Sequence, residues 1–205
     1  MTEISLILFD LNGVLYLYDR DARIAQLSLA TKRSPDHVKA AIWDSGFEDT
    51  GDTGALDAVG YLRGFAACLG CDLSEADWVT AQQAAVTPIA PTLALLSRIR
   101  TGVRCAVLTN NNLLVLKHFS ILYPEVTGLV GARACVSAEF GARKPDADVY
   151  LKCLVRLAAA PAETLFVDDS PANVAGARAA GLVGCDYAGA EALAIELDKG
   201  GLLER

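Results

Sequence analysis

The sequence opens with an almost wholly apolar segment that ends at an acidic residue. Residues 4–9 read Ile-Ser-Leu-Ile-Leu-Phe, Asp10 follows them, and Asn12-Gly13 comes directly after. An apolar run of this length indicates a buried strand, and Asn-Gly favours a tight turn. Ligands of open α/β sheets bind at the carboxyl ends of the strands. The pattern therefore predicts a nucleophile or metal ligand at Asp10, although a helix cap or turn is the commoner use of a lone aspartate there.

Apolar runs of this kind alternate with helical patterns along most of the chain. Strands are predicted at residues 4–9, 103–108, 134–137, 164–167 and 182–185. Helices are predicted at residues 92–100, 113–122, 146–158, 171–180 and 190–197. Buried strands that alternate with helices of this length indicate a parallel sheet covered on both faces. We therefore expect an α/β fold with a Rossmann-like, doubly wound parallel sheet as its core.

The segment after the first strand interrupts this alternation. It has no convincing strand, and helical patterns cover residues 20–32, 35–43, 54–69 and 74–86. Ser34-Pro35 and Ser74 followed by Asp77 are typical of helix N-termini. The sequence therefore predicts a core made of residues 1–17 and 88–205, with residues 18–87 inserted as a small helical cap.

Composition excludes several classes of partner. The 205 residues carry a net charge of −7, and 53% of them are apolar. An acidic chain offers no electrostatic attraction to nucleic acid or to an anionic membrane surface. No apolar stretch is long enough to span a bilayer, and the first residues lack the basic start of a signal peptide. We expect a cytoplasmic protein without nucleic-acid or membrane partners; the oligomeric state stays open.

Three further segments place polar groups where predicted strands end. Thr109 and Asn110 follow the second strand and could hold an anion through hydroxyl and amide donors. Lys144 precedes a Pro-Asp helix start, which could aim its ammonium at a shared centre. Asp168 and Asp169 follow the fourth strand, and two such acids are costly to crowd unless a cation compensates them. Each signal is weak alone, because a lone lysine or amide is usually a surface residue or a cap.

Taken in order, the four segments resemble the motifs of the haloacid dehalogenase-like hydrolase superfamily, in the branch with a small helical cap after the first strand. The resemblance covers nearly the whole chain. Its motifs are Asp10-Leu-Asn12-Gly-Val-Leu, Thr109, Lys144 with Pro145-Asp146, and Asp168-Asp169, with residues 173–181 following as in relatives.

The resemblance implies a Mg²⁺-dependent phosphohydrolase that acts on a small phosphorylated metabolite. Asp10 would attack phosphorus and form an aspartyl-phosphate. Thr109 and Asn110 would bind the transferring phosphoryl group, and Lys144 would neutralise the charge shared with Asp10.

The resemblance also implies a metal site and a role for the cap. Asp10, the backbone carbonyl of Asn12 and Asp169 would hold Mg²⁺. Asp168 would join them directly or through water, which makes an all-oxygen site that suits this hard ion. The helical cap would exclude water and select the substrate. Tyr16, Tyr18, Arg20, Trp43 and Phe47 are candidates to face the cleft, although their spacing fits core packing equally well.

One catalytic position departs from the family pattern. Phosphatases of the family usually carry a second aspartate where this chain has Asn12, and that acid protonates the leaving oxygen and later activates water. A carboxamide can form hydrogen bonds with both but cannot exchange a proton. Loss of general acid–base catalysis typically costs about 10²–10⁴-fold in rate. The sequence therefore predicts retained metal and phosphate binding with slowed turnover.

Two alternatives remain open beside the phosphohydrolase. The first is a weakly or non-catalytic protein that binds a phosphorylated ligand, which Asn12 favours. The second is a 2-haloacid dehalogenase, whose relatives use the same aspartate without metal; Lys144 and Tyr150 have a matching spacing. Asp168 and Asp169 argue against it, because two more anions beside a carboxylate nucleophile would repel a halocarboxylate unless a metal screened them.

Overall fold

A parallel sheet forms the centre of the protein in the computed structural model, which describes residues 3–204. The five strands lie in the order β5-β4-β1-β6-β7, and every neighbouring pair is parallel. The chain adds β4 and β5 on one side of β1 and then crosses to add β6 and β7 on the other, which confirms the doubly wound prediction. The strands are β1 (Leu6–Phe9), β4 (Arg104–Thr109), β5 (Ala134–Val136), β6 (Thr164–Asp168) and β7 (Val183–Asp186).

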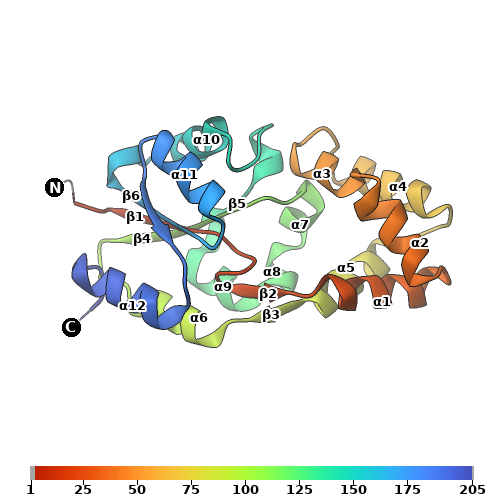
Figure 1. The fold of residues 1–205 in the computed structure, drawn as a ribbon, viewed down its shortest axis with the longest axis horizontal. Coiled ribbons are helices and arrows are strands. Elements are labelled where there is room, and N and C mark those ends of the chain that lie inside the picture. Colours follow the sequence, from red (N-terminus) through yellow and green to blue (C-terminus); the bar gives the residue numbers. More distant parts are fainter. Residues whose placement is uncertain (1–2, 205) are drawn as a thin grey trace.

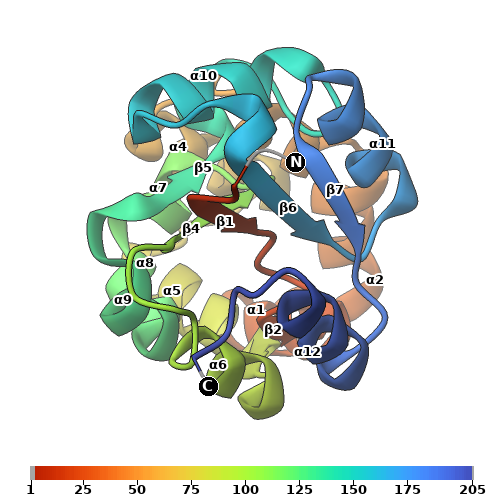
Figure 2. The same cartoon turned by 90° about the vertical axis from the view of Figure 1, so that its left-hand side faces the viewer.

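Helices cover both faces of this sheet (Figure 2). Alternate residues of a strand point to opposite faces, and Leu6 and Leu8 pack with α10 and α11 whereas Ile7 and Phe9 pack with α6, α9 and α12. All four of these strand residues are fully buried. The helices of the core are α6 (Ala90–Leu96), α7 (Leu113–Lys117), α8 (Phe119–Leu122), α9 (Pro124–Val130), α10 (Ala147–Leu157), α11 (Pro171–Ala179) and α12 (Ala190–Lys199).

A two-stranded ribbon leads from the sheet into a group of helices at one end of the molecule (Figure 1). The strands β2 (Tyr16–Tyr18) and β3 (Val86–Pro88) pair antiparallel, so the chain leaves and returns side by side. We call residues 19–85 the helical segment. It contains α1 (Arg20–Thr31), α2 (Pro35–Lys39), the helical turn η1 (Ala40–Asp44), α3 (Phe47–Asp52), α4 (Ala58–Leu69) and α5 (Glu75–Ala85).

The structure bears out the helical nature of this insertion and two of its predicted caps. Ser34 and Ser74 each accept a hydrogen bond from the backbone N–H three residues later. That the insertion is a separate cap (residues 18–87) on a core formed by residues 1–17 and 88–205 stays a prediction. The first two residues and the last residue of that predicted core lie outside the described part of the chain.

The structure differs from the predicted elements in several places. The predicted helix 92–100 ends at Leu96, and α3 was not predicted. The predicted helix 113–122 breaks at His118, whose φ and ψ are −105° and 15°, and Pro124 starts the further helix α9. The predicted helix 54–69 begins only at Ala58, because Gly54 has a φ of +72° that a right-handed helix does not allow. The strands β2 and β3 were not expected, since runs this short carry little periodicity.

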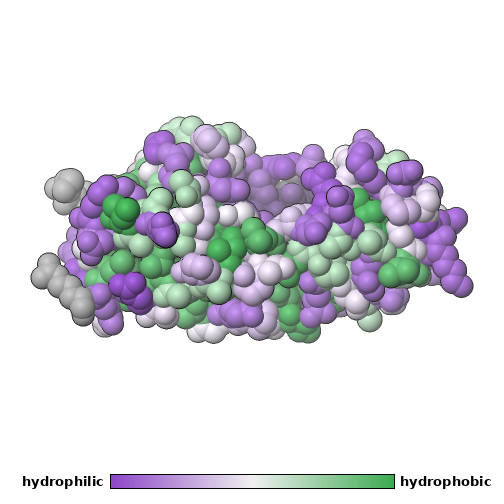
Figure 3. All heavy atoms as spheres, turned by 60° about the horizontal axis from the view of Figure 1, so that its bottom comes forward, coloured by the Kyte–Doolittle hydropathy of each residue, from purple (hydrophilic) through white to green (hydrophobic). Residues whose placement is uncertain are grey.

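The outer surface mixes polar and apolar side chains, as the face in Figure 3 shows. Among the described residues, no helix combines the length and the apolar character needed to cross a membrane.

Candidate active site

The carboxyl ends of β1 and β6 bring two acids together where the strand order reverses. These strands are paired with Phe9 opposite Val167, and the backbone N–H of Asp10 donates to the Val167 carbonyl at 2.8 Å. Asp10 and Asp168 therefore leave adjacent strands side by side, at the edge where doubly wound sheets bind ligands.

Lys144 connects these two carboxylates. Its Nζ lies 2.7 Å from Oδ1 of Asp10 and 2.6 Å from Oδ2 of Asp168. The lysine is only 3% exposed. A buried ammonium between two buried carboxylates forms strong, charge-assisted hydrogen bonds. The three residues come from separate parts of the chain, because Asp10 follows β1, Lys144 precedes α10 and Asp168 ends β6.

Asn110 holds the backbone of Lys144 in place. Its side-chain Nδ2 donates to the Lys144 carbonyl at 3.0 Å, and its Oδ1 accepts from the Lys144 N–H at 2.8 Å. Both ends of the carboxamide are thus engaged in positioning the lysine. A direct contact of Asn110 with substrate stays a prediction.

Asp168 is held by a network that the sequence did not reveal. Its Oδ1 accepts from the Ser170 N–H at 2.8 Å, and both of its oxygens accept from Nδ2 of Asn173, at 3.0 and 3.1 Å. The Tyr150 hydroxyl donates to the carbonyl of Asn173 at 2.7 Å. The position of Asn173 in the first turn of α11 was the one available signal, since that turn faces the strand end it follows.

Burial controls the charge of the acids. Burial raises the pKa of Asp10 to about 6. The neighbouring Lys144 ammonium lowers this pKa, and the charge of Asp168 raises it. Burial and then the charge of Asp168 raise the pKa of Asp169. The site therefore has an excess of negative charge that one lysine does not compensate, and a bound cation would lower the pKa of both acids.

The carboxylates fit a divalent metal ion. Oxygens of Asp10, Asp168 and Asp169 all lie within 4.8 Å of one another. Gly13 has a φ of +90°, and a Cβ built on it would lie 2.2 Å from an oxygen of Asp169, so only glycine leaves room for that carboxylate. Carboxylate and carbonyl oxygens are the ligands that Mg²⁺ prefers. The oxygens of Asp168 already accept several hydrogen bonds, which makes Asp10 and Asp169 the freer side-chain ligands.

Asn12 and Thr109 border the same site. Thr109 is 2% exposed, and its Oγ1 accepts from Nδ2 of Asn111 at 2.9 Å, which leaves its own proton available to an anion. The side-chain Oδ1 of Asn12 is buried and has no hydrogen-bond partner among the described residues. An orphaned acceptor is costly unless a donor meets it, so a ligand hydroxyl or a water is expected there.

A pocket of about 410 Å³ lies beside this cluster, between the strand ends and the helical segment. Of the five candidate cleft residues, Tyr18, Arg20 and Trp43 line it, whereas Tyr16 and Phe47 do not. Tyr16 is buried, and Phe47 packs against aromatic side chains of α4. The residues that line the pocket are Asn12, Tyr18, Arg20, Arg23, Trp43, Asp44, Gly46, Glu48, Asp49, Asp52, Gln82, Asn110, Asn111 and Arg143.

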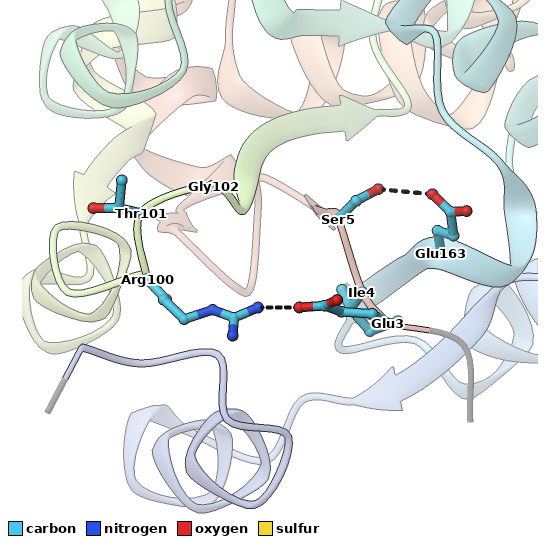
Figure 4. Close-up of a pocket in the computed structure, with 7 residues that line it drawn as sticks. All are labelled: Glu3, Ile4, Ser5, Arg100, Thr101, Gly102 and Glu163. Carbon is cyan, nitrogen blue, oxygen red and sulfur yellow. Dashed lines mark hydrogen bonds and ion pairs between the residues drawn. The ribbon is translucent and has the colours of Figure 1, made fainter.

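A second hollow, of about 550 Å³, lies at the opposite ends of the strands (Figure 4). Four of its polar side chains pair with each other: Ser5 donates to Glu163 at 3.1 Å, and Arg100 contacts Glu3 at 2.7 Å. Because it lies at the amino ends of the strands, it is not where a sheet of this type binds its ligand.

One curated relative is similar to part of this chain. The sesquiterpene phosphatase astK of Aspergillus oryzae (strain ATCC 42149 / RIB 40) is 43% identical over 61 residues, which are 30% of this chain and 31% of that enzyme. The match thus spans less than a third of the length of the relative.

Two solved structures share the fold. A HAD family enzyme of Bacteroides thetaiotaomicron, in complex with magnesium and inorganic phosphate, is 21% identical with a TM-score of 0.74, covering 89% of this chain and 93% of that one. The L-2-haloacid dehalogenase of Xanthobacter autotrophicus with covalently bound chloropropionic acid is 22% identical with a TM-score of 0.62, covering 98% and 85%.

The family assignment comes from the sequence as a whole. The family model for haloacid dehalogenase-like hydrolases matches residues 4–181, a range that contains Asp10, Thr109, Lys144 and Asp168. Because the family model matches most of its length, and because its fold is that of a HAD family enzyme, this chain belongs to the haloacid dehalogenase-like hydrolase family.

Proposed function

We propose that the protein is a Mg²⁺-dependent phosphohydrolase that acts on a small phosphorylated metabolite through an aspartyl-phosphate on Asp10. The contact of the buried Lys144 ammonium with Asp10 and Asp168 carries this proposal. That arrangement provides a fixed positive charge beside a carboxylate nucleophile. Phosphoryl transfer needs little else from a protein beyond positioning and charge stabilisation.

Each residue of the cluster has a distinct part in the proposed reaction. The ionised carboxylate of Asp10 attacks phosphorus, and the ammonium of Lys144 stabilises the charge that spreads over the phosphoryl oxygens. Thr109 donates its hydroxyl proton to one of those oxygens. Asp168 orients Lys144, and Asn173 and Tyr150 in turn hold Asp168.

Magnesium fits the remaining charge of this site. Asp10, the backbone carbonyl of Asn12 and Asp169 would hold it, with Asp168 in direct contact or through water. When bound, Mg²⁺ supplies positive charge to the phosphoryl oxygens and to the attacking carboxylate.

The pocket favours a hydrophilic leaving group. Apart from Trp43 and Gly46, every lining residue has a polar or charged side chain. The relative named as a sesquiterpene phosphatase acts, by that name, on a terpene phosphate. A terpenyl chain would bury apolar surface against these polar groups without satisfying them, so a sugar or polyol phosphate fits this pocket better.

Asn12 supports a second candidate function, namely binding of a phosphorylated ligand with weak or no turnover. The carboxamide cannot exchange a proton with the leaving group. A phosphatase screen of the unaltered chain separates the two candidates, with phosphosugars, nucleotides and an activated aryl phosphate, each with and without Mg²⁺. Hydrolysis that requires Mg²⁺ supports the enzyme, whereas binding without hydrolysis supports the binding protein.

The dehalogenase alternative has less support. Tyr150 is fully buried, and its hydroxyl donates to the carbonyl of Asn173. Tyr150 does not line the pocket. The exposed carboxylate of Asp169 adds a charge that a halocarboxylate would have to approach. The structural likeness to a dehalogenase is a likeness of fold.

Millimolar Mg²⁺ is expected to raise the Tm of the protein at neutral pH. A cation that binds only the folded state stabilises it by about 1.4 kcal/mol at about ten times its Kd, or roughly 3–6 °C for a chain of this length. Thermal denaturation of the wild type, Asp169→Asn and Asp198→Asn measures the effect. Asp169→Asn should lose most of the shift, and Asp198→Asn, on the exposed side of α12, should keep it. If Mg²⁺ does not change the Tm of the wild type, with or without phosphate, the proposed metal site is ruled out.

A further inference from the structure

The end of α3 is fixed against the strand ends of the core. The Ser137 hydroxyl donates to the backbone carbonyl of Asp52 at 2.7 Å, and its oxygen accepts from the N–H of Asn111 at 3.1 Å. Asp49, on the same helix, pairs with Arg143 at 2.7 Å. One serine therefore connects Asp52 of the helical segment to the loop that follows Thr109.

The side chain of Asp52 lines the pocket together with Asn12 and Asn110. It is 9% exposed, and its carboxyl group has no hydrogen bond or ion pair within residues 3–204. Neither nearby guanidinium pairs with this carboxyl. Arg23 contacts Glu48 through Nη1, and its Nε and Nη2 have no partner among the described residues, whereas Arg143 pairs with Asp49. A buried carboxyl without a partner is costly to ionise, so it holds its proton more tightly than a surface acid.

Charged groups on three elements act on this carboxyl. Burial, followed by Glu48 and Asp49 of α3, raises the pKa of Asp52, and Arg143 before α10 and Arg23 of α1 lower it. The balance brings the pKa to about 7. A general acid or base works best when its pKa lies near the working pH, and Asp52 meets that condition.

We propose, building on the phosphohydrolase function above, that Asp52 is the general acid and base of this enzyme and replaces the aspartate that is missing at position 12. The side chain of Asp52 lines the same pocket as Asn12, where the leaving group is proposed to bind. The backbone of Asp52 is held by Ser137, which also accepts from Asn111 in the loop after Thr109.

The proton transfers balance over the two steps. In the first, Asp10 forms a bond to phosphorus, the bond from phosphorus to the leaving oxygen breaks, and that oxygen takes the proton of Asp52. In the second, water attacks phosphorus and gives its proton to the Asp52 carboxylate. The bond between phosphorus and Asp10 breaks, inorganic phosphate leaves, and both acids return to their starting states.

Rapid-mixing kinetics with nitrophenyl phosphate and Mg²⁺ separate these steps. Nitrophenolate leaves without a proton donor, so the initial burst reports attack by Asp10, and the later steady rate reports attack by water. Asp52→Asn should keep the burst and lower the steady rate by about 10²-fold or more. In the wild type, the steady rate should rise with pH through about 7, because the ionised base is the active form.

Two further variants serve as control and rescue. Asp49→Asn removes a carboxylate three residues earlier on α3 and should keep the pH-dependent limb, moved to lower pH because Asp49 raises the pKa of Asp52. Asn12→Asp in the Asp52→Asn protein should restore the steady rate. A neutral carboxyl and a carboxamide are nearly isosteric, so Asp52→Asn is expected to fold.

Stability gives an independent readout. A carboxyl whose pKa is raised in the folded state destabilises the protein as it ionises, so the wild type loses stability as pH rises through about 7. Asp52→Asn should therefore melt at a higher temperature than the wild type above neutral pH and at a similar temperature near pH 4.

The outcomes are distinct. The role of Asp52 would be overturned if Asp52→Asn keeps a steady rate within about threefold of the wild type and if that rate still rises with pH through about 7. If neither the wild type nor Asn12→Asp releases nitrophenolate, in a burst or at a steady rate, the proposed function is overturned, and with it this inference.

Discussion

Asn12→Asp is expected to raise the turnover of alkyl phosphates by roughly 10²-fold when Asp52 is also replaced with asparagine. The new carboxyl is nearly isosteric with the carboxamide, so it adds a proton donor without repacking the turn before Gly13. An alkyl leaving oxygen needs that proton. The extra negative charge beside Asp10 is the cost, and Lys144 and Mg²⁺ offset it.

The substrate and the background set the size of this gain. With an activated aryl ester the first step should gain little, because its oxygen leaves unaided. In the wild-type background the gain should be smaller, since Asp52 already supplies the proton. Glycerol phosphate and nitrophenyl phosphate, compared in burst and steady-state experiments, resolve these steps. If the double variant folds, binds Mg²⁺ and hydrolyses nothing in a broad panel, the binding function is the correct one.

Lys144→Met is expected to reduce turnover by roughly 10²–10³-fold, which is typical for loss of one charge-stabilising group. Methionine matches the length of the lysine side chain but leaves Asp10 and Asp168 facing each other without their shared cation. Removal of one partner from a buried ion pair typically costs about 3–5 kcal/mol of folding free energy.

The pH dependence of the loss of stability follows from the pKa of Asp10. Lys144 lowers the pKa of Asp10, so its removal raises that pKa further above 6. A raised carboxyl pKa costs stability as pH rises through it, and the deficit of Lys144→Met should be larger at pH 8 than at pH 5. Lys199→Met, which removes an exposed lysine of α12, should show neither effect. Equal activity of Lys144→Met and Lys199→Met would exclude the proposed charge stabilisation.

The sequence predicted the strand ends well, for a physical reason. Strands of a parallel sheet are buried on both faces and read as continuous apolar runs. The residue at which such a run ends is then the residue at the ligand-binding edge. Asp10 and Asp168 follow runs of this kind. Lys144 follows no strand, and its placement came from its resemblance to a family motif.

The pocket could not be predicted from the sequence. Its walls combine side chains that meet only after folding, such as Asp52 and Ser137, which are 85 residues apart. Asp52 ends a short helix between Gly46 and Gly54, where no apolar periodicity exists to orient it. Its raised pKa depends on burial against the core, a property that only the folded chain has.

Asp10 is expected to carry the phosphoryl group during turnover, and the residue that becomes phosphorylated can be mapped chemically. The protein is mixed with nitrophenyl phosphate and Mg²⁺, quenched in acid and reduced with borohydride, which converts an aspartyl-phosphate to homoserine. Peptide mass spectrometry should find homoserine at position 10 in the wild type and in greater yield in Asp52→Asn, where water attack is slow. Asp10→Ala should carry none. Homoserine at another position, or none in any protein that hydrolyses the ester, would show that Asp10 is not the nucleophile.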